Sequence, residues 1–131
     1  MKILITGSRS LKENAYEQIK KVMTKHTPTL LLHGGAKGAD QLAQRYADEH
    51  GIPTKVMRPD YKNNHYKTAP LLRNTELVKN ADYVIALYAE GRTRKGGTWD
   101  TVQKAIATHK PITEVLPNGN TRHIQPTLTL L

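Results

Sequence analysis

Three glycine-rich turns each follow an apolar, strand-like run and stand directly before a helix-like pattern. The turns are Gly7-Ser8-Arg9, Gly34-Gly35-Ala36-Lys37-Gly38 and Lys95-Gly96-Gly97-Thr98. If the three runs are neighbouring parallel strands, all three turns gather at one edge of the sheet. The backbone N–H groups and helix N-termini at that edge would bind a phosphate or another anion. The spacing therefore predicts a pocket for a nucleotide-like molecule.

Two common phosphate-binding sites do not fit these turns. A P-loop needs Lys and Ser or Thr directly after its last glycine, but Gly38 is followed by Ala39-Asp40. The dinucleotide fingerprint needs Gly-x-Gly-x-x-Gly after the first strand and a carboxylate at the end of the second. The first turn lacks that spacing, and the second strand ends in His33-Gly34-Gly35. The chain is therefore predicted to be neither an ATPase nor an ordinary NAD-dependent dehydrogenase.

Alternating strands and helices must position these turns. The expected strands are 2–6, 30–33, 54–57, 83–88 and 112–116, and the expected helices are about 12–25, 39–50, 70–80 and 98–109. We expect Thr98 to cap the last helix, with Val102, Ala105, Ile106 and His109 on its buried face. Because Asn118-Gly119-Asn120 is a turn signal, residues 121–125 are expected to return as an antiparallel strand. The prediction is a Rossmann-like three-layer α/β sandwich with a mainly parallel five-stranded sheet and an antiparallel edge strand at the C-terminus.

Length and composition restrict the class of protein. The 131 residues suit one domain, 1–131, in which 117–131 form a C-terminal hairpin and tail. The chain has no cysteine, no apolar run of about 20 residues and no signal-peptide pattern, so we expect a cytoplasmic protein without a membrane partner. The net charge of +9 predicts an anionic partner, either a small phosphorylated ligand or a nucleic acid. The apolar tail 125–131 is expected to dock on its own sheet or on a second subunit.

Four segments together resemble the SLOG superfamily, the Rossmann-like group that unites Smf/DprA proteins with the Lonely-Guy phosphoribohydrolases. The two segments in the first half are Gly7-Ser8-Arg9 and His33-Gly34-Gly35-Ala36-Lys37-Gly38-Ala39-Asp40. The other two are Pro70-Leu71-Leu72-Arg73-Asn74 and Gly96-Gly97-Thr98-Trp99-Asp100. In the order of these segments, the chain is similar to the small single-domain branch of the superfamily, which is called YspA or cpYpsA-related. The resemblance covers roughly residues 1–116.

The resemblance implies a nucleotide or nucleotide-derived ligand across the C-terminal edge of the sheet. It implies ligand contacts from the residues that match the four motifs: Gly7, Ser8, Arg9, His33, Gly34, Gly35, Lys37, Gly38, Asp40, Arg73, Asn74, Gly96, Gly97 and Thr98. It also favours a homodimer or a higher homo-oligomer.

Several of these residues also have structural interpretations. Arg9 can be a surface arginine, His33 a buried and satisfied histidine, and Asp40 a carboxylate that complements the dipole of its helix. The loop cations Arg92, Arg94 and Lys95 suit either a cover over a bound anion or solvated loop charge. Three aromatic residues near the expected pocket suit either base stacking or packing: Tyr61, Tyr66 and Trp99. The histidines lack a metal-ligand spacing, so we expect neither a metal nor a cofactor.

Three functions remain open. The favoured one is a sensor or sequestering protein for a nucleotide-derived signal such as an ADP-ribose-like molecule, in conflict between phages and bacteria. The second is a nucleotide phosphoribohydrolase, an N-glycosidase related to the Lonely-Guy enzymes, with Asp40 and Asp100 as candidate catalytic residues. Those enzymes carry a glutamate three positions after the threonine of their Gly-Thr turn, where this chain has Thr101. The third is a single-stranded DNA-binding protein related to DprA, although an aromatic content of 5% leaves little for base stacking.

Overall fold

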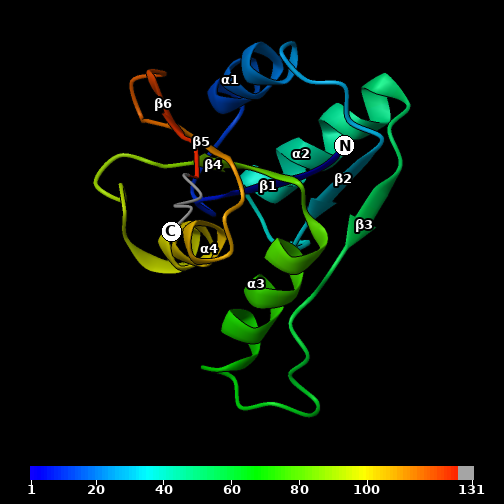
Figure 1. Ribbon diagram of the computed structural model, residues 1–131, viewed down its shortest axis with the longest axis vertical. Helices are drawn as coiled ribbons and strands as arrows, with labels where there is room; N and C mark the ends of the chain where they lie inside the picture. The colour runs from blue at the N-terminus through cyan, green and yellow to red at the C-terminus, as the bar shows by residue number, and fades with distance from the viewer. Residues whose placement is uncertain (127–131) are drawn as a thin grey trace, which may run out of the picture.

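One sheet, with strand order β3-β2-β1-β4-β5-β6, forms the centre of the molecule (Figure 1). The computed structural model describes residues 1–126. The strands are β1 (Lys2–Gly7), β2 (Leu30–His33), β3 (Thr54–Val56), β4 (Tyr83–Leu87), β5 (Ile112–Val115) and β6 (Thr121–Ile124). The first five are parallel, and β6 pairs antiparallel with β5. This arrangement confirms the predicted Rossmann-like sheet with an antiparallel edge strand.

Helices cover both faces of the sheet. They are α1 (Asn14–Met23), α2 (Ala39–His50), α3 (Ala69–Asn80) and α4 (Gly96–Ala107). One apolar cluster joins α1 and α2 to Ile3 and Ile5 of β1, and a second joins α3 and α4 to Leu4. Successive side chains of a strand point to opposite faces, so β1 contributes to both layers of the core. The result is the predicted three-layer sandwich.

The apolar spacing of α2 explains its position on the sheet. All five apolar residues that the sequence places on one helix face are buried: Ala39, Leu42, Ala43, Tyr46 and Ala47. Gly51 then ends the helix in the left-handed region, with φ of 64°, as predicted for a C-cap glycine. In α3, Pro70 lies in the first turn, where a missing N–H leaves no hydrogen bond unmade.

The prediction for α4 was wrong in two respects. The helix begins at Gly96 and its N-cap is Lys95, so Thr98 lies inside the first turn and not at the cap. Gly96 adopts a φ of 71°, a conformation that favours glycine, and this lets the helix begin before the threonine.

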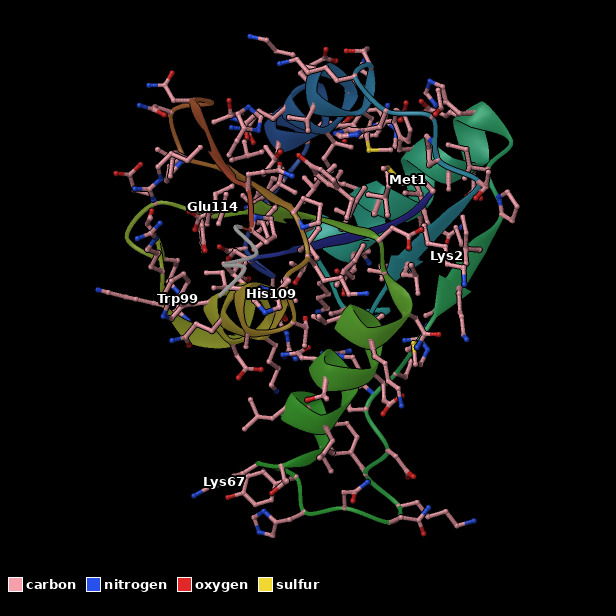
Figure 2. The ribbon with its side chains drawn as sticks, in the orientation of Figure 1. Met1, Lys2, Lys67, Trp99, His109 and Glu114 are labelled. Carbon is pink, nitrogen blue, oxygen red and sulfur yellow. The ribbon has the colours of Figure 1, made fainter. Side chains whose placement is uncertain are left out.

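The buried face of α4 also lies nearer its N-terminus than expected. Its buried residues are Thr98, Thr101, Val102 and Ala105. Ile106 is 41% exposed, and His109, which is labelled in Figure 2, lies beyond the end of the helix and is exposed. The Thr101 hydroxyl donates to the carbonyl oxygen of Gly97 at 3.1 Å, so this buried polar side chain is satisfied within the helix.

The remaining boundaries agree with the predictions within about two residues at each end. Residues 1–126 contain no helix whose length and hydropathy would let it cross a bilayer. The expectation that the apolar tail docks on its own sheet or on a second subunit concerns residues that lie mostly outside the described part of the chain.

Candidate functional site

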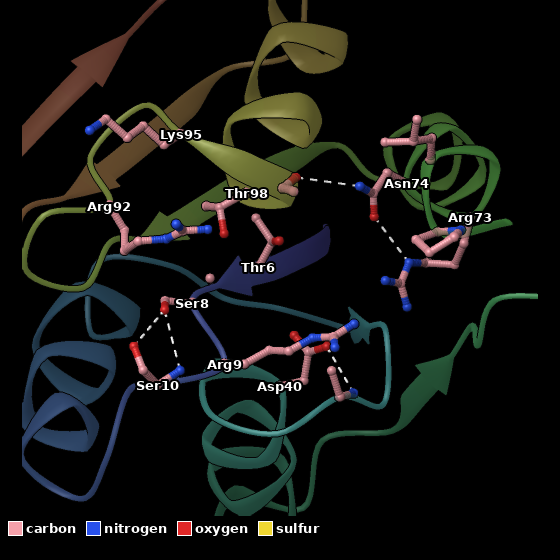
Figure 3. Close-up of a pocket in the computed structure, with 15 residues that line it drawn as sticks. Thr6, Ser8, Arg9, Ser10, Asp40, Arg73, Asn74, Arg92, Lys95 and Thr98 are labelled. Atoms are coloured by element: carbon pink, nitrogen blue, oxygen red, sulfur yellow. Dashed lines mark hydrogen bonds between the residues drawn. The ribbon is translucent and has the colours of Figure 1, made fainter. Parts of the chain in front are cut away.

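A cavity of about 670 Å³ opens beyond the carboxyl ends of β1 and β4 (Figure 3). These strands are neighbours, but the chain continues from β1 toward β2 on one side and from β4 toward β5 on the other. The two connections therefore leave a gap between them at this point, which is where open α/β sheets generally bind their ligands. The fold thus gives a physical reason for a cavity at this edge.

Four segments that are distant in the sequence line this cavity. They are the turn after β1, the turn after β2, the first half of α3, and the loop after β4. Their lining residues are Thr6, Gly7, Ser8, Arg9, Ser10, Ala36, Asp40, Pro70, Leu71, Arg73, Asn74, Arg92, Lys95, Gly97 and Thr98. Eight of the fourteen predicted ligand contacts are in this set: Gly7, Ser8, Arg9, Asp40, Arg73, Asn74, Gly97 and Thr98. The expected convergence of Arg9, Arg73 and Thr98 is therefore present.

A second cavity, of about 510 Å³, adjoins the first on the side of β2 and β3. Arg9, Ala36 and Arg73 line both cavities. Gly34, Gly35 and Lys37 line only the second. The structure therefore divides the predicted contacts between two connected spaces.

Gly7 and Gly38 allow the first two turns to pack together. A Cβ on Gly7 would stand 2.6 Å from the carbonyl oxygen of Leu87 and 2.7 Å from the Cβ of Ala39. A Cβ on Gly38 would overlap the carbonyl oxygen of Ser8, and Gly38 also has a φ of 72°. The Ala39 N–H donates to the Ser8 carbonyl oxygen at 3.2 Å, so this amide of α2 is already used within the protein. Both glycines hold the turns together; Gly7 also lines the first cavity, whereas Gly38 lines neither.

Gly34 and Gly35 make room for two arginines. The space that a Cβ on Gly34 would fill is occupied by the Arg73 guanidinium, and that over Gly35 by the Arg58 guanidinium. Nη1 of Arg73 donates to the Gly34 carbonyl oxygen at 2.9 Å, and Nη1 of Arg58 to that of Gly35 at 2.8 Å. These glycines were predicted to let the ligand approach the backbone. In the structure they let guanidinium groups approach it.

Arg73 and Asn74 continue into a hydrogen-bonded chain that joins α3 to α4. Nε of Arg73 donates to Oδ1 of Asn74 at 3.0 Å, and Nδ2 of Asn74 donates to the Asp100 carboxylate at 3.1 Å. Asp100 also pairs with Nζ of Lys104 at 2.8 Å. Asn74 is buried and lines the first cavity, whereas Asp100 lines neither cavity. Of the two candidate catalytic carboxylates, only Asp40 therefore lines the site.

Asp40 is a buried carboxylic acid in the wall of the first cavity, with 8% of its surface exposed. Its Oδ2 accepts a hydrogen bond from the Ala36 N–H at 3.1 Å (Figure 3). Burial raises the pKa of this carboxyl above its usual value, and the Ala36 hydrogen bond and the charge of Arg73 offset only part of that effect. A raised pKa favours the protonated carboxyl, which is the form that acts as a general acid.

His33 has a structural role. It is buried, its Nδ1 accepts from the Gly35 N–H at 3.0 Å, and its Nε2 lies 2.7 Å from Oε1 of Gln44. Because Nδ1 accepts, Nε2 carries the proton and donates to Gln44. His33 lines neither cavity. Both of its ring nitrogens are therefore occupied in fixing the turn after β2.

The loop between β4 and α4 contributes cations of two kinds. Arg92 and Lys95 line the first cavity; in Figure 3 the Arg92 guanidinium points toward Thr98, while the Lys95 side chain points away. Arg94 lies elsewhere: its Nη2 pairs with Oε1 of Glu114 at 3.0 Å, and its guanidinium lies over the Trp99 ring. Gly96 lines neither cavity, and a Cβ there would meet the Arg92 guanidinium at 2.9 Å.

Sequence reasoning did not name several residues that line the two cavities. Thr6 and Ser10 line the first, and Gln41, Arg58 and Pro59 line the second. Arg58 follows β3 closely, so the strand-end rule that located the other turns would have found it. Ser10 and Gln41 lie near turns that the motifs had already marked, but nothing in their own spacing singles them out.

Comparison with known proteins identifies the family of this chain. Residues 1–64 match the YspA, cpYpsA-related SLOG family. The chain is also 31% identical over 100 residues to the Gene 61 protein of Mycobacterium phage D29, across 70% of this chain and 79% of that protein. The chain belongs to the YspA-related SLOG family. Membership in the SLOG family indicates binding or processing of a nucleotide-related molecule. In this SLOG protein the matched region contains the turns after β1 and β2, including Arg9 and Asp40.

Proposed function

We propose that this protein binds a nucleotide or nucleotide-derived ligand at the C-terminal edge of its sheet, as a sensor of that ligand or to sequester it. One observation carries the proposal: three separate segments place Arg9, Arg73 and Arg92 in the wall of one cavity at the switch point of a doubly wound sheet. Three guanidiniums around one space favour an anion there, and guanidinium groups match phosphate geometry by bidentate hydrogen bonds. The relative in a phage supports a role in conflict between phages and bacteria.

The expected affinity is in the range of a metabolite sensor. Each hydrogen bond to a charged group contributes roughly 1.5–3 kcal/mol, and a helix N-terminus adds roughly 0.3–1 kcal/mol. Three or four such contacts, less the cost of immobilising the ligand, give a binding free energy of about −8 kcal/mol, which corresponds to a micromolar Kd.

Arg9 offers the sharpest test of the proposal. Its side chain is exposed and makes no hydrogen bond or ion pair to residues 1–126, so its removal leaves no internal group unpaired. We expect Arg9→Ala to weaken binding of AMP, ADP or ADP-ribose about 10- to 100-fold in titration calorimetry, with an unchanged melting temperature. Lys21→Ala is the matched control because it removes one exposed positive charge from α1, which does not line the site.

The outcome of this comparison is decisive for the proposal. If no nucleotide shifts the melting temperature of the wild-type protein, or if Arg9→Ala and Lys21→Ala bind equally well, the cavity is not the ligand site. Mass spectrometry of small molecules that co-purify with the protein is a separate experiment, which identifies the physiological ligand directly.

A second candidate function, hydrolysis of an N-glycosidic bond, is favoured by the buried Asp40. Its carboxyl lines the cavity and its pKa is raised, first by burial. In this reading Asp40 donates a proton to the departing base as the bond from the base to the sugar breaks, water attacks the sugar carbon, and the proton that the water loses returns to Asp40. Free base should then accumulate from nucleoside monophosphates in a chromatographic assay, and Asp40→Asn should bind the nucleotide without cleaving it. A broad panel of nucleotides that yields no free base eliminates this function.

A further inference from the structure

The two cavities meet at a pair of like-charged side chains. Arg9 and Arg73 both line the first and the second cavity. In Figure 3 their guanidinium ends point toward each other across the gap between the turn after β1 and α3. Burial lowers the pKa of Arg73, and the positive charge of Arg9 lowers it further. Asp40 is the carboxylate near Arg73. Cations therefore outnumber anions where the two spaces join.

An anion between these guanidiniums would relieve their repulsion and accept hydrogen bonds from both. Nη1 and Nε of Arg73 are held by Gly34 and Asn74, which fixes this guanidinium while its remaining N–H groups stay available. Lys37 and Arg58 add further positive charge on the side of the second cavity. The junction is therefore suited to a group with more than one negative charge, such as a diphosphate.

The walls on the two sides of the junction differ in chemistry. The first cavity carries hydroxyl groups from Thr6, Ser8 and Ser10, which suit a sugar with many hydroxyls of its own. The second cavity carries Pro59 and Tyr61, and the Tyr61 side chain is 55% exposed. An exposed aromatic ring beside a cavity offers a flat surface on which a nucleobase can stack.

Each cavity is the size of a small-molecule site, which generally ranges from about 300 to 1,000 Å³. We infer that the ligand is a nucleoside diphosphate that carries a sugar, with its phosphates between Arg9 and Arg73, its base against Tyr61 in the second cavity, and its sugar in the first. This inference rests on the proposed function and adds to it the class of ligand and the direction in which the ligand lies.

The test compares whole and partial ligands by titration calorimetry. The probes are ADP-ribose and UDP-glucose as complete molecules, AMP as the half with the base, and ribose 5-phosphate as the half with the sugar. We expect one of the complete molecules to bind at least about tenfold more tightly than either half, because both cavities and the junction are then filled.

Tyr61→Ala shows where the base lies. We expect it to weaken binding of the complete molecule and of AMP about tenfold, because a stacking surface is lost, and to leave ribose 5-phosphate unaffected. Tyr66→Ala is the matched control: Tyr66 is 65% exposed in the same loop and lines neither cavity, so this variant should bind every probe as the wild type does.

The possible failures are distinguishable. If AMP binds as tightly as both complete molecules, or if Tyr61→Ala binds AMP normally, the two-part ligand is wrong while the proposed function stands. If Tyr61→Ala weakens ribose 5-phosphate as much as AMP, the assigned direction is wrong. If none of the four probes binds the wild-type protein, the proposed function fails together with this inference.

Discussion

Arg73 combines a structural contact with a place in the site. Its guanidinium donates to the carbonyl oxygens of Gly34 at 2.9 Å and Met57 at 3.4 Å, so it ties α3 to the turns after β2 and β3. The same guanidinium forms part of the wall between the two cavities. Removal of this side chain would therefore disturb both the packing of the turns and the binding of an anion, and these two effects need separate measurements.

Gly34→Ala tests both effects through the position of the Arg73 guanidinium. A Cβ at this position would displace the Arg73 guanidinium, which is the end of a flexible side chain and can move without shifting the backbone. We expect a loss of about 1 kcal/mol in unfolding free energy, equivalent to one hydrogen bond, and a loss of roughly tenfold or more in nucleotide affinity. Thermal unfolding and titration calorimetry on the same variant measure the two effects.

Gly38→Ala provides the contrasting case. Its Cβ would overlap the backbone of Ser8, and its φ of 72° is disfavoured for alanine. We expect a destabilisation of about 2–5 kcal/mol from strain and overpacking together. If Gly34→Ala binds nucleotide as the wild type does, the position of the Arg73 guanidinium is not needed for binding.

At the level of elements, Glu114 of β5 holds the loop between β4 and α4 in place. The Glu114 side chain is fully buried and accepts from the Tyr88 hydroxyl at 2.6 Å and from Nη2 of Arg94 at 3.0 Å. Arg122 of β6 lies 3.6 Å from the same carboxylate. Because Arg94 is in the loop that carries Arg92 and Lys95, this buried carboxylate fixes the backbone of one wall of the first cavity.

We expect Glu114→Gln to destabilise the protein by about 1.5–3 kcal/mol at neutral pH, because hydrogen bonds to a charged group are lost. Burial alone would raise the pKa of Glu114, but the hydrogen bonds from Arg94 and Tyr88 and the charges of both arginines leave it below the ordinary 4.5. The stabilisation by the ionised form is therefore present above about pH 4.5 and is lost as the pH falls through the folded-state pKa.

Thermal unfolding between pH 3 and pH 7 checks this expectation. The wild type should lose more stability on acidification than Glu114→Gln, whose side chain does not titrate. Glu17→Gln is the control, since Glu17 forms only an exposed ion pair with Lys20. Equal pH dependence of wild type and Glu114→Gln would show that this carboxylate does not hold the loop through its charge.

Helices with a regular spacing of apolar residues were predictable from the sequence. The start of α4 and the contacts between guanidinium groups and the backbone were not. The spacing of Ala39, Leu42 and Tyr46 located α2 within a residue, and the resemblance to the SLOG superfamily implied Arg9 and Arg73 as contacts of one ligand, in agreement with the shared cavity that they line. The start of α4 was mispredicted because threonine is a common N-cap, whereas here the conformation of Gly96 decides where the helix begins. The guanidiniums over Gly34 and Gly35 were not predictable, since they depend on tertiary contacts with α3 and the loop after β3.

For the whole molecule, the net charge of +9 leaves binding of single-stranded DNA to be tested. We expect any affinity for an oligothymidine probe to be a charge effect that falls steeply between 50 and 200 mM salt, with a log–log slope of about −0.7 for each phosphate contacted. A nucleotide held between Arg9 and Arg73 should be affected much less, because few phosphates are involved. Fluorescence anisotropy over this salt range measures both; an oligonucleotide that remains tightly bound at 200 mM would favour a DNA-binding function instead.

The short β3 strand at the edge of the sheet limits how copies of this chain can associate. It offers only the residues Thr54–Val56 for pairing, and its outer side includes the charged Lys55. An edge this short and charged discourages a neighbouring chain from adding a strand, which is the contact that leads to aggregates. We therefore expect that a homodimer of the kind implied by the family resemblance would associate through surfaces other than this edge.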